Sequence, residues 1–238
     1  MKLPPSISHP ELQEYNYSLL KKYGDDFRHS GLWFNGIPTL SEYNPVISVW
    51  NYALNKKYFF ATGDLSYRNI LVKRRINFDQ LRLLGVSRIV TDTELTSLGQ
   101  PIVTLKRDGQ RIYLYRLENS NISGILFNTR KELESFFLTN SVLKDSAASP
   151  KITRVGSGLR IEFKNIGERY LLLPLEFSRC IHSKSQNKVE IFRAQEFLIG
   201  VKFENNLSLD LDFRYGIFTN SYCKIQDYLD FRKFNKIN

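Results

Sequence analysis

The strongest constraint in this sequence is the alternation of apolar and polar residues along its last third. Leu159, Ile161 and Phe163 alternate with charged neighbours, and residues 207–214 repeat the same alternation. Successive side chains of a β-strand point to opposite faces of a sheet, so a period of two predicts strands with one buried face. Several such strands without helices between them predict an antiparallel β-sandwich, jelly-roll-like, over residues 151–238.

The earlier part of the chain mixes helical and extended patterns. Residues 86–91 read as a buried strand, and the pair Asp108-Gly109 between two alternating runs is typical of a tight hairpin turn. Thr129 followed by Glu132 forms a capping box, which predicts a helix that buries Leu133. We therefore expect this part to be a mixed α/β domain.

A small, polar segment at residues 144–150 ends in proline and is the predicted domain boundary. The expected fold class is α+β. It consists of an N-terminal mixed α/β domain, residues 1–145, followed by an antiparallel β-sandwich domain, residues 151–238.

The net charge of +10 is spread over both parts of the chain. Such a dispersed excess fits a surface that faces anionic lipid head groups or phosphates. No nucleic-acid-binding motif is present, so nucleic acid is the less favoured partner. The sequence also has neither an apolar run long enough to span a membrane nor the apolar core of a signal peptide.

No motif of an established catalytic centre occurs in the sequence, which lacks phosphate-binding glycine loops and a nucleophile elbow. The best-placed acidic pair is Asp92 and Glu94, which follows the strand expected at residues 86–91. A helix cap is the commoner role for such residues, and a small hydrolase is the alternative. The three histidines lie far apart, so we expect no metal site and no cofactor.

Cys180 and Cys223 are the only cysteines, and their spacing does not match a metal-binding motif. They form either one disulfide or two buried free thiols. We expect free thiols, because a chain of 238 residues is long enough to fold without a covalent link.

An aromatic cluster lies between residues 33 and 52, and it includes Trp33, Tyr43 and Trp50. Aromatic rings stack on the apolar faces of sugars and on bases, so the cluster is a candidate binding platform. The alternative is that these rings form the lid of the hydrophobic core.

The order of four segments resembles a known family. The runs GIPTLSEYNPV (Gly36–Val46), LRLLGVSRIVTD (Leu81–Asp92), IYLYRLEN (Ile112–Asn119) and the strand-rich region from Leu171 to Tyr215 carry the resemblance. They are similar to motifs in the extracytoplasmic C-terminal domain of the YfhO-type members of the GT-C class of glycosyltransferases, which are bacterial multi-pass membrane proteins. The catalytic carboxylates of that family lie between membrane helices, so the resemblance transfers no catalytic residue to this chain.

The resemblance implies a non-catalytic accessory domain that binds a glycan or lipid-linked saccharide in cell-envelope polysaccharide synthesis. Its expected location is the extracytoplasmic face of a membrane if the chain is part of a larger protein, and the cytoplasm if Met1 is the natural start. A nucleic-acid-associated basic protein and a hydrolase using Asp92 and Glu94 are the alternatives. The candidate ligand-binding residues are Trp33, Asn35, Tyr43, Asn44, Trp50 and Asp92, and the candidate contacts to phosphates or lipid head groups are Lys73, Arg74 and Arg75.

Overall fold

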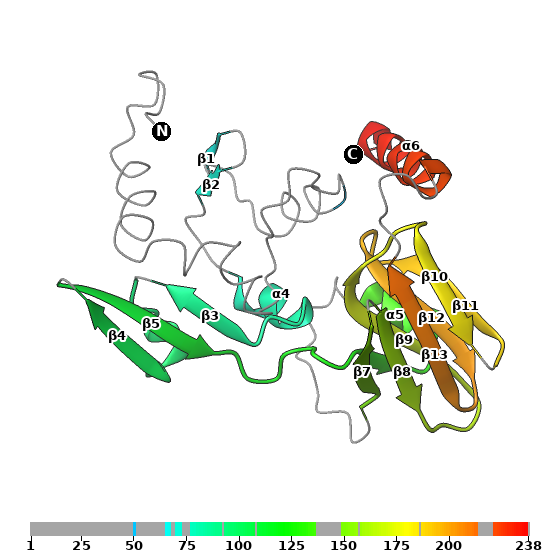
Figure 1. Cartoon of the computed structure of the whole chain (residues 1–238), viewed down its shortest axis with the longest axis horizontal. Helices are drawn as coiled ribbons and strands as arrows, with labels where there is room; N and C mark the ends of the chain where they lie inside the picture. Colours follow the sequence, from blue (N-terminus) through cyan, green and yellow to red (C-terminus); the bar gives the residue numbers. More distant parts are fainter. Residues whose placement is uncertain are drawn as a thin grey trace. The chain divides into compact units, whose positions relative to one another are not determined.

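The computed structural model describes residues 50, 65–67, 70–72, 77–91, 93–107, 109–136, 149–156, 158–185, 187–213 and 221–237 (Figure 1). The chain divides into two compact units. The first contains Met1–Ile47, Phe59–Ile76 and Ser87–Leu117, and the second contains Ser48–Tyr58, Asn77–Val86 and Glu118–Asn238.

The first unit contains a three-stranded antiparallel sheet of order β3-β5-β4. Its elements are β3 (Arg88–Thr91), the 3-10 helix η1 (Thr96–Leu98), β4 (Val103–Arg107) and β5 (Gln110–Arg116), and β1 (Leu65–Tyr67) pairs with β2 (Ile70–Val72). The predicted hairpin is confirmed, because Arg107 pairs with Gln110 across the turn and Gly109 has a φ of 78°. Glycine adopts that left-handed conformation without a steric penalty.

The expectation of a buried strand at residues 86–91 is wrong. β3 lies at an edge of the sheet, pairs antiparallel with β5, and exposes Arg88 and Val90. The rule that ligands bind at the carboxyl ends of strands applies to open parallel sheets. It therefore gives no support to a site at Asp92.

The second unit contains two four-stranded antiparallel sheets, of order β10-β13-β8-β7 and β11-β12-β9-β6. Their strands are β6 (Ile125–Phe127), β7 (Lys151–Val155), β8 (Gly158–Phe163), β9 (Glu168–Glu176), β10 (Ile181–Ser185), β11 (Val189–Ala194), β12 (Leu198–Glu204) and β13 (Leu207–Phe213). β6 precedes residues 144–150, yet it pairs with β9 and belongs to the same unit as the strands that follow.

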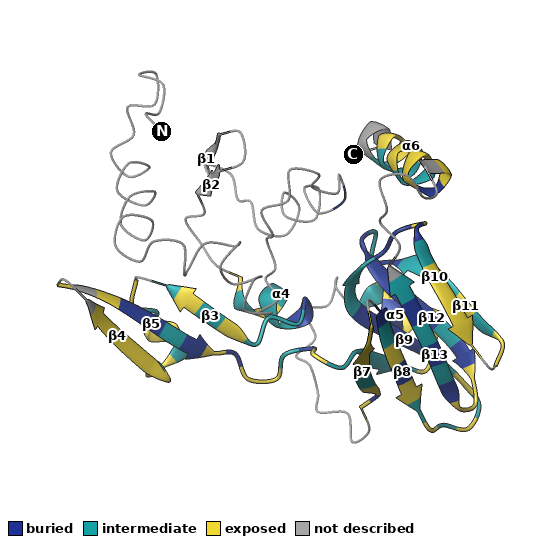
Figure 2. Ribbon diagram, in the orientation of Figure 1, coloured by how far each residue is buried: buried dark blue, intermediate teal, exposed yellow. Residues whose placement is uncertain are grey.

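One apolar core joins these two sheets, so they form a β-sandwich. Ile161, Leu209 and Leu211 come from one sheet, and Leu171 and Ile199 from the other; all five are almost completely buried (Figure 2). The alternation in the sequence predicted this arrangement, since it places one side chain in two toward the opposite sheet.

The face of the β11-β12-β9-β6 sheet that points away from the sandwich core also buries an apolar side chain, and the helix α5 (Arg130–Ser135) contacts β9. Leu172 is fully buried although its neighbours in β9 face the sandwich core. The predicted capping box is present: the Thr129 hydroxyl accepts from the Glu132 amide, and the Glu132 carboxylate accepts from the Thr129 amide. It opens α5, whose Leu133 is fully buried as expected.

The described part of the second unit also includes the short α4 (Phe78–Leu83) and the long α6 (Ser221–Ile237). The expectation of a β-sandwich throughout residues 151–238 is corrected by α6, which is a helix. Apolar side chains recur every three to four positions along α6, which is the period of a helix. The described chain as a whole is β-rich, with mostly antiparallel sheets and few helices.

Candidate functional site

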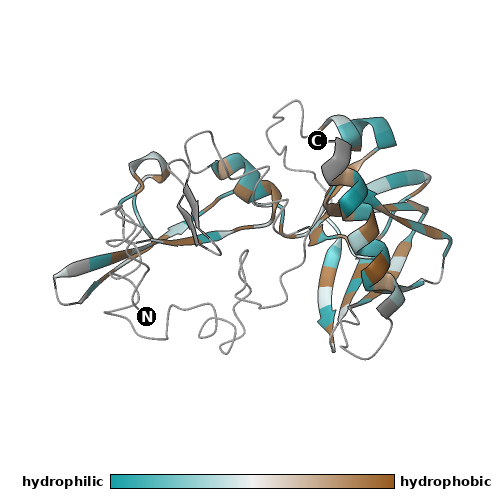
Figure 3. Ribbon diagram, turned by 90° about the horizontal axis from the view of Figure 1, so that it is seen from above, coloured by the Kyte–Doolittle hydropathy of each residue, from teal (hydrophilic) through white to brown (hydrophobic). Residues whose placement is uncertain are grey.

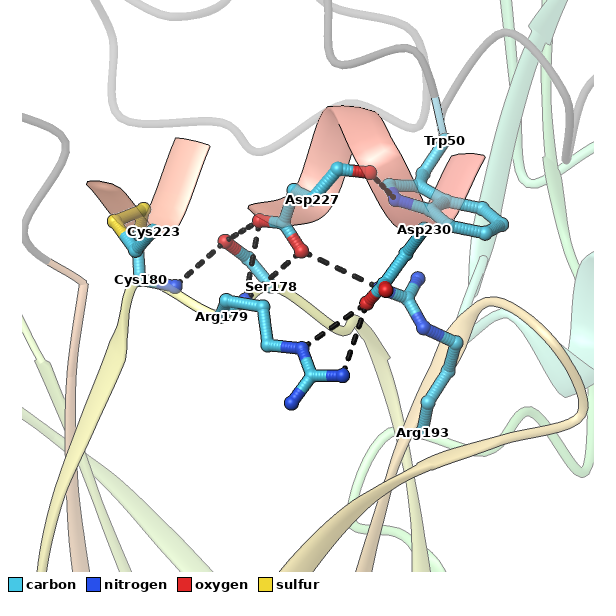
Figure 4. A network of polar contacts seen from close by, with 8 residues as sticks. All are labelled: Trp50, Ser178, Arg179, Cys180, Arg193, Cys223, Asp227 and Asp230. Atoms are coloured by element: carbon cyan, nitrogen blue, oxygen red, sulfur yellow. Dashed lines mark hydrogen bonds and ion pairs between the residues drawn. A yellow bond between two sulfur atoms is a disulfide. The ribbon is translucent and has the colours of Figure 1, made fainter. Parts of the chain in front are cut away.

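A cluster of polar contacts joins α6 to the sandwich (Figure 4). The Asp227 carboxylate accepts hydrogen bonds from the Ser178 hydroxyl at 2.6 Å, from the Arg179 amide at 3.0 Å and from the Arg193 guanidinium at 3.3 Å. Ser178 and Arg179 lie between β9 and β10, and Arg193 lies on β11. Asp227 therefore ties the helix to two separate segments of the sandwich.

Asp230 lies one helical turn further along α6 and faces the same cluster. Its carboxylate accepts from the Arg179 side chain at 3.0 Å and lies 3.9 Å from the guanidinium of Arg193. Residues three apart in a helix share a face, so both acids of α6 are directed toward the sandwich.

Arg193 is enclosed by aromatic rings as well as by these acids. Its guanidinium carbon lies 3.8 Å from the ring centroid of Trp50 and 4.6 Å from that of Phe177. Burial lowers the pKa of Arg193, while Asp227 and Asp230 act in the opposite direction. Because an arginine keeps its charge under any ordinary condition, the result is a partly buried cation held by two carboxylates and two rings.

Trp50 is the one candidate binding residue within the described part of the chain, and its ring is in the interior. It is 3% exposed, and its indole nitrogen donates to the backbone oxygen of Asp227 at 3.2 Å. Its ring meets Phe197 and Phe231 edge to face, with centroids 6.0 and 5.4 Å apart. Of the two roles weighed for the aromatic cluster, Trp50 therefore has the core role.

The other candidates lie outside the described residues. These are Trp33, Asn35, Tyr43, Asn44, Asp92, Lys73, Arg74 and Arg75. Glu94, the partner of Asp92 in the hydrolase alternative, is described and exposed.

The expectation of free thiols is wrong, because Cys180 and Cys223 form a disulfide with their Cα atoms 5.2 Å apart. It joins the loop after β9 to the first turn of α6. The expectation considered only whether the whole chain could bury a core. A terminal helix outside the sandwich core depends on its own contacts, so it benefits from a covalent link even in a large chain.

Asp210, on the outer face of the β10-β13-β8-β7 sheet, is engaged in a surface ion pair. The Asp210 carboxylate receives two hydrogen bonds from the Arg160 guanidinium, at 2.7 and 2.9 Å, which lower the pKa of Asp210. Within the described ranges, no group of three or more His, Cys, Asp or Glu residues is placed to hold a metal ion.

None of the helices in the described part of the chain is long and apolar enough to cross a membrane. Comparison with protein-family models, with curated proteins and with solved structures gives no match. The resemblance to YfhO-type domains therefore stays a prediction that these comparisons do not test.

Sequence reasoning did not identify Ser178, Asp227, Asp230 and Arg193 as a cluster. The sequence signal for this cluster is the spacing of Asp227 and Asp230, which are three residues apart and therefore share one face of a helix. Chemically, the Asp227 carboxylate is occupied by three donors, which use most of the acceptor positions of such a group. The cluster is therefore suited to docking α6 and not to acid–base chemistry.

Proposed function

We propose that this chain is a non-catalytic binding module that acts on the extracytoplasmic side of a membrane. Its ligand is a glycan or lipid-linked saccharide of the cell envelope, and it works in association with a membrane glycosyltransferase. The disulfide between Cys180 and Cys223 is the observation that carries the proposal. Disulfides persist in oxidising compartments and are rare in the cytosol.

The contacts of α6 agree with a structural role for that disulfide. The covalent link and the Asp227 cluster fix the same helix to the same loop of the sandwich. A module whose only task is to bind benefits from such rigidity, because less conformational freedom is lost on binding.

The binding surface that we propose contains Trp33 and Tyr43 as stacking rings, with Asn35, Asn44 and Asp92 as hydrogen-bonding partners. Lys73, Arg74 and Arg75 would contact the phosphates of a lipid-linked saccharide. Trp50 is not part of this surface, because Arg193 and aromatic side chains cover its ring. Stacking with a few hydrogen bonds gives weak affinity, on the order of micromolar to millimolar.

The chain has only two tryptophans, so one titration contains its own control. We expect the indole NH resonance of Trp33 to shift when a cell-envelope saccharide is added to ¹⁵N-labelled protein. The indole resonance of the buried Trp50 should stay in place. A titration with a panel of such saccharides in which the Trp33 signal never moves would contradict glycan binding.

Salt dependence separates this proposal from the nucleic-acid alternative. Binding to a phosphate backbone weakens steeply as salt rises, because condensed counterions are released on binding. Stacking on an uncharged sugar responds little to salt. A short duplex that binds more tightly than every saccharide, with a steep salt slope, would favour the nucleic-acid alternative.

The compartment is tested separately through the thiols. Cells that make the protein are quenched in acid, and a maleimide-linked polymer is added under denaturing conditions. We expect no labelling unless a reductant is added first. Labelling of both cysteines without reductant would remove the support for an extracytoplasmic location.

A further inference from the structure

The outward face of α6 carries large apolar side chains. Tyr222 is 69% exposed, Ile225 53%, Tyr228 51% and Leu229 40%. Residues three or four apart lie on one side of a helix, so these four side chains form a stripe. Figure 3 shows apolar and polar segments along the same helix. We call these residues the α6 stripe.

The charges of α6 are segregated between its two sides. Asp227 and Asp230 are directed at the sandwich, where Arg193 and Arg179 pair with them. Three cations, Lys224, Arg232 and Lys233, are exposed. By helical position, Arg232 lies one turn beyond Tyr228 and Leu229 within the α6 stripe, and Lys224 and Lys233 lie along its two borders. The outward side of the helix is thus apolar and cationic, without an acidic residue among its described side chains.

The docking contacts fix this outward side in place. The disulfide holds the first turn of α6, Asp227 and Asp230 hold its middle, and Phe231 and Phe234 pack on Trp50 with ring centroids 5.4 and 5.5 Å away. The α6 stripe therefore cannot turn inward without breaking these contacts. Its exposure is a property of the docked helix.

From this arrangement we propose that the α6 stripe and its cations rest on an anionic lipid surface. Amphipathic helices bind membranes in this way, with apolar side chains at the acyl boundary and Lys or Arg at the phosphates. The two phenols place apolar rings and a polar tip at the interface, and the long cationic side chains extend toward the head groups. The proposal depends on α6 alone and is independent of glycan binding.

The position of Arg232 favours a lipid layer over a protein partner. A protein that covered the α6 stripe would bury this guanidinium beside Tyr228 and Leu229, and it would have to supply a matched carboxylate there. A lipid layer offers mobile phosphates to this guanidinium, so no single carboxylate has to be positioned to match it. Charge complementarity therefore points to anionic lipid.

The test is co-sedimentation of the full chain with vesicles of phosphatidylglycerol and phosphatidylcholine, compared with phosphatidylcholine alone. We expect binding to the anionic vesicles only. Removal of one cation near an anionic surface weakens binding about fivefold, so the Arg232→Glu, Lys233→Glu double variant should bind at least about tenfold more weakly. The Ile225→Ser, Leu229→Ser double variant should also lose binding, and its loss should persist in low salt.

A matched control is the double variant Lys151→Glu, Arg154→Glu, which changes the net charge equally on exposed positions of β7. It should bind the anionic vesicles nearly as well as the parent chain. Equal loss in this control and in the α6 variant would show that net charge alone acts, and would overturn the proposal.

Two other results would overturn it as well. One is self-association that both α6 variants abolish, without binding of the parent chain to vesicles, which would assign the stripe to a second copy of the chain. The other is binding to phosphatidylcholine vesicles at the same strength. Circular dichroism and thermal melting that match the parent chain show that each variant is folded.

Discussion

The guanidinium of Arg193 is stacked on the ring of Trp50, with its central carbon 3.8 Å from the ring centroid. The two residues lie far apart in the sequence, and both also contact Asp227 of α6. This pair therefore links three separate segments of the second unit. Its contribution to stability can be measured directly.

Replacement of Arg193 by leucine should destabilise the second unit. The change leaves Asp227 and Asp230 without their shared cation, and the loss of a hydrogen bond between charged, partly buried groups costs about 1.5–3 kcal/mol. We expect a lower urea midpoint by equilibrium denaturation. Arg160→Leu is the control, because its pair with Asp210 is exposed and should contribute far less. Equal losses in the two variants would contradict a special role for Arg193.

Loss of the disulfide should destabilise the chain by about 2–4 kcal/mol, since the covalent link closes a loop of 43 residues. The parent chain should melt at a lower temperature when a reductant is present. The double variant Cys180→Ser, Cys223→Ser should melt at that lower temperature with or without reductant. A reductant-independent melting temperature in the parent chain is the result that would count against this role.

Acidification should weaken the fold through surface carboxylates. Hydrogen bonds from Lys202 and then Tyr170 lower the pKa of Glu168, and the hydrogen bond from Arg160 lowers that of Asp210. A carboxyl whose pKa is lower in the folded state stabilises the fold above its unfolded pKa of about 4. That contribution is lost as the pH falls from about 4 through the lowered folded values.

The double variant Glu168→Gln, Asp210→Asn tests this dependence. Its urea midpoint should change less than that of the parent chain as the pH falls from about one unit above the ordinary carboxyl pKa of ~4 to about one and a half units below it. At neutral pH it should be somewhat less stable. Parallel curves for the two proteins over the acid range would show that other carboxyls dominate.

Gly158 is required at the start of β8 because no side chain fits there. A Cβ atom at this position would collide with the backbone oxygen of Leu211 on the neighbouring strand β13. We expect Gly158→Ala to cost about 1–3 kcal/mol by forcing the strands apart, measured by thermal melting. Gly156→Asn is the control, because that position is open and its φ of 59° lies in the left-handed region that asparagine adopts most readily among side-chain-bearing residues. A melting temperature for Gly158→Ala close to that of the control would contradict the steric argument.

Much of the local structure was predictable because short-range chemistry determines it. The Thr129 capping box, the turn at Gly109 and the strands around Ile161 and Leu209 follow from neighbouring residues alone. The exposed edge position of β3 was not predictable, since the same apolar run suits a central strand or an edge. Of the predicted binding residues, the structure describes Trp50 and places it in the interior.

The sequence by itself determined that the region around Ile161 and Leu209 forms antiparallel strands, because the alternation of side chains fixes which face of each strand is apolar. Only the tertiary structure decided which cations, acids and rings meet. Arg193, Trp50, Asp227 and the pair Cys180–Cys223 belong to segments that local patterns do not connect. Their contacts depend on how α6 lies against the sandwich. That placement is set by long-range packing, which a local period cannot encode.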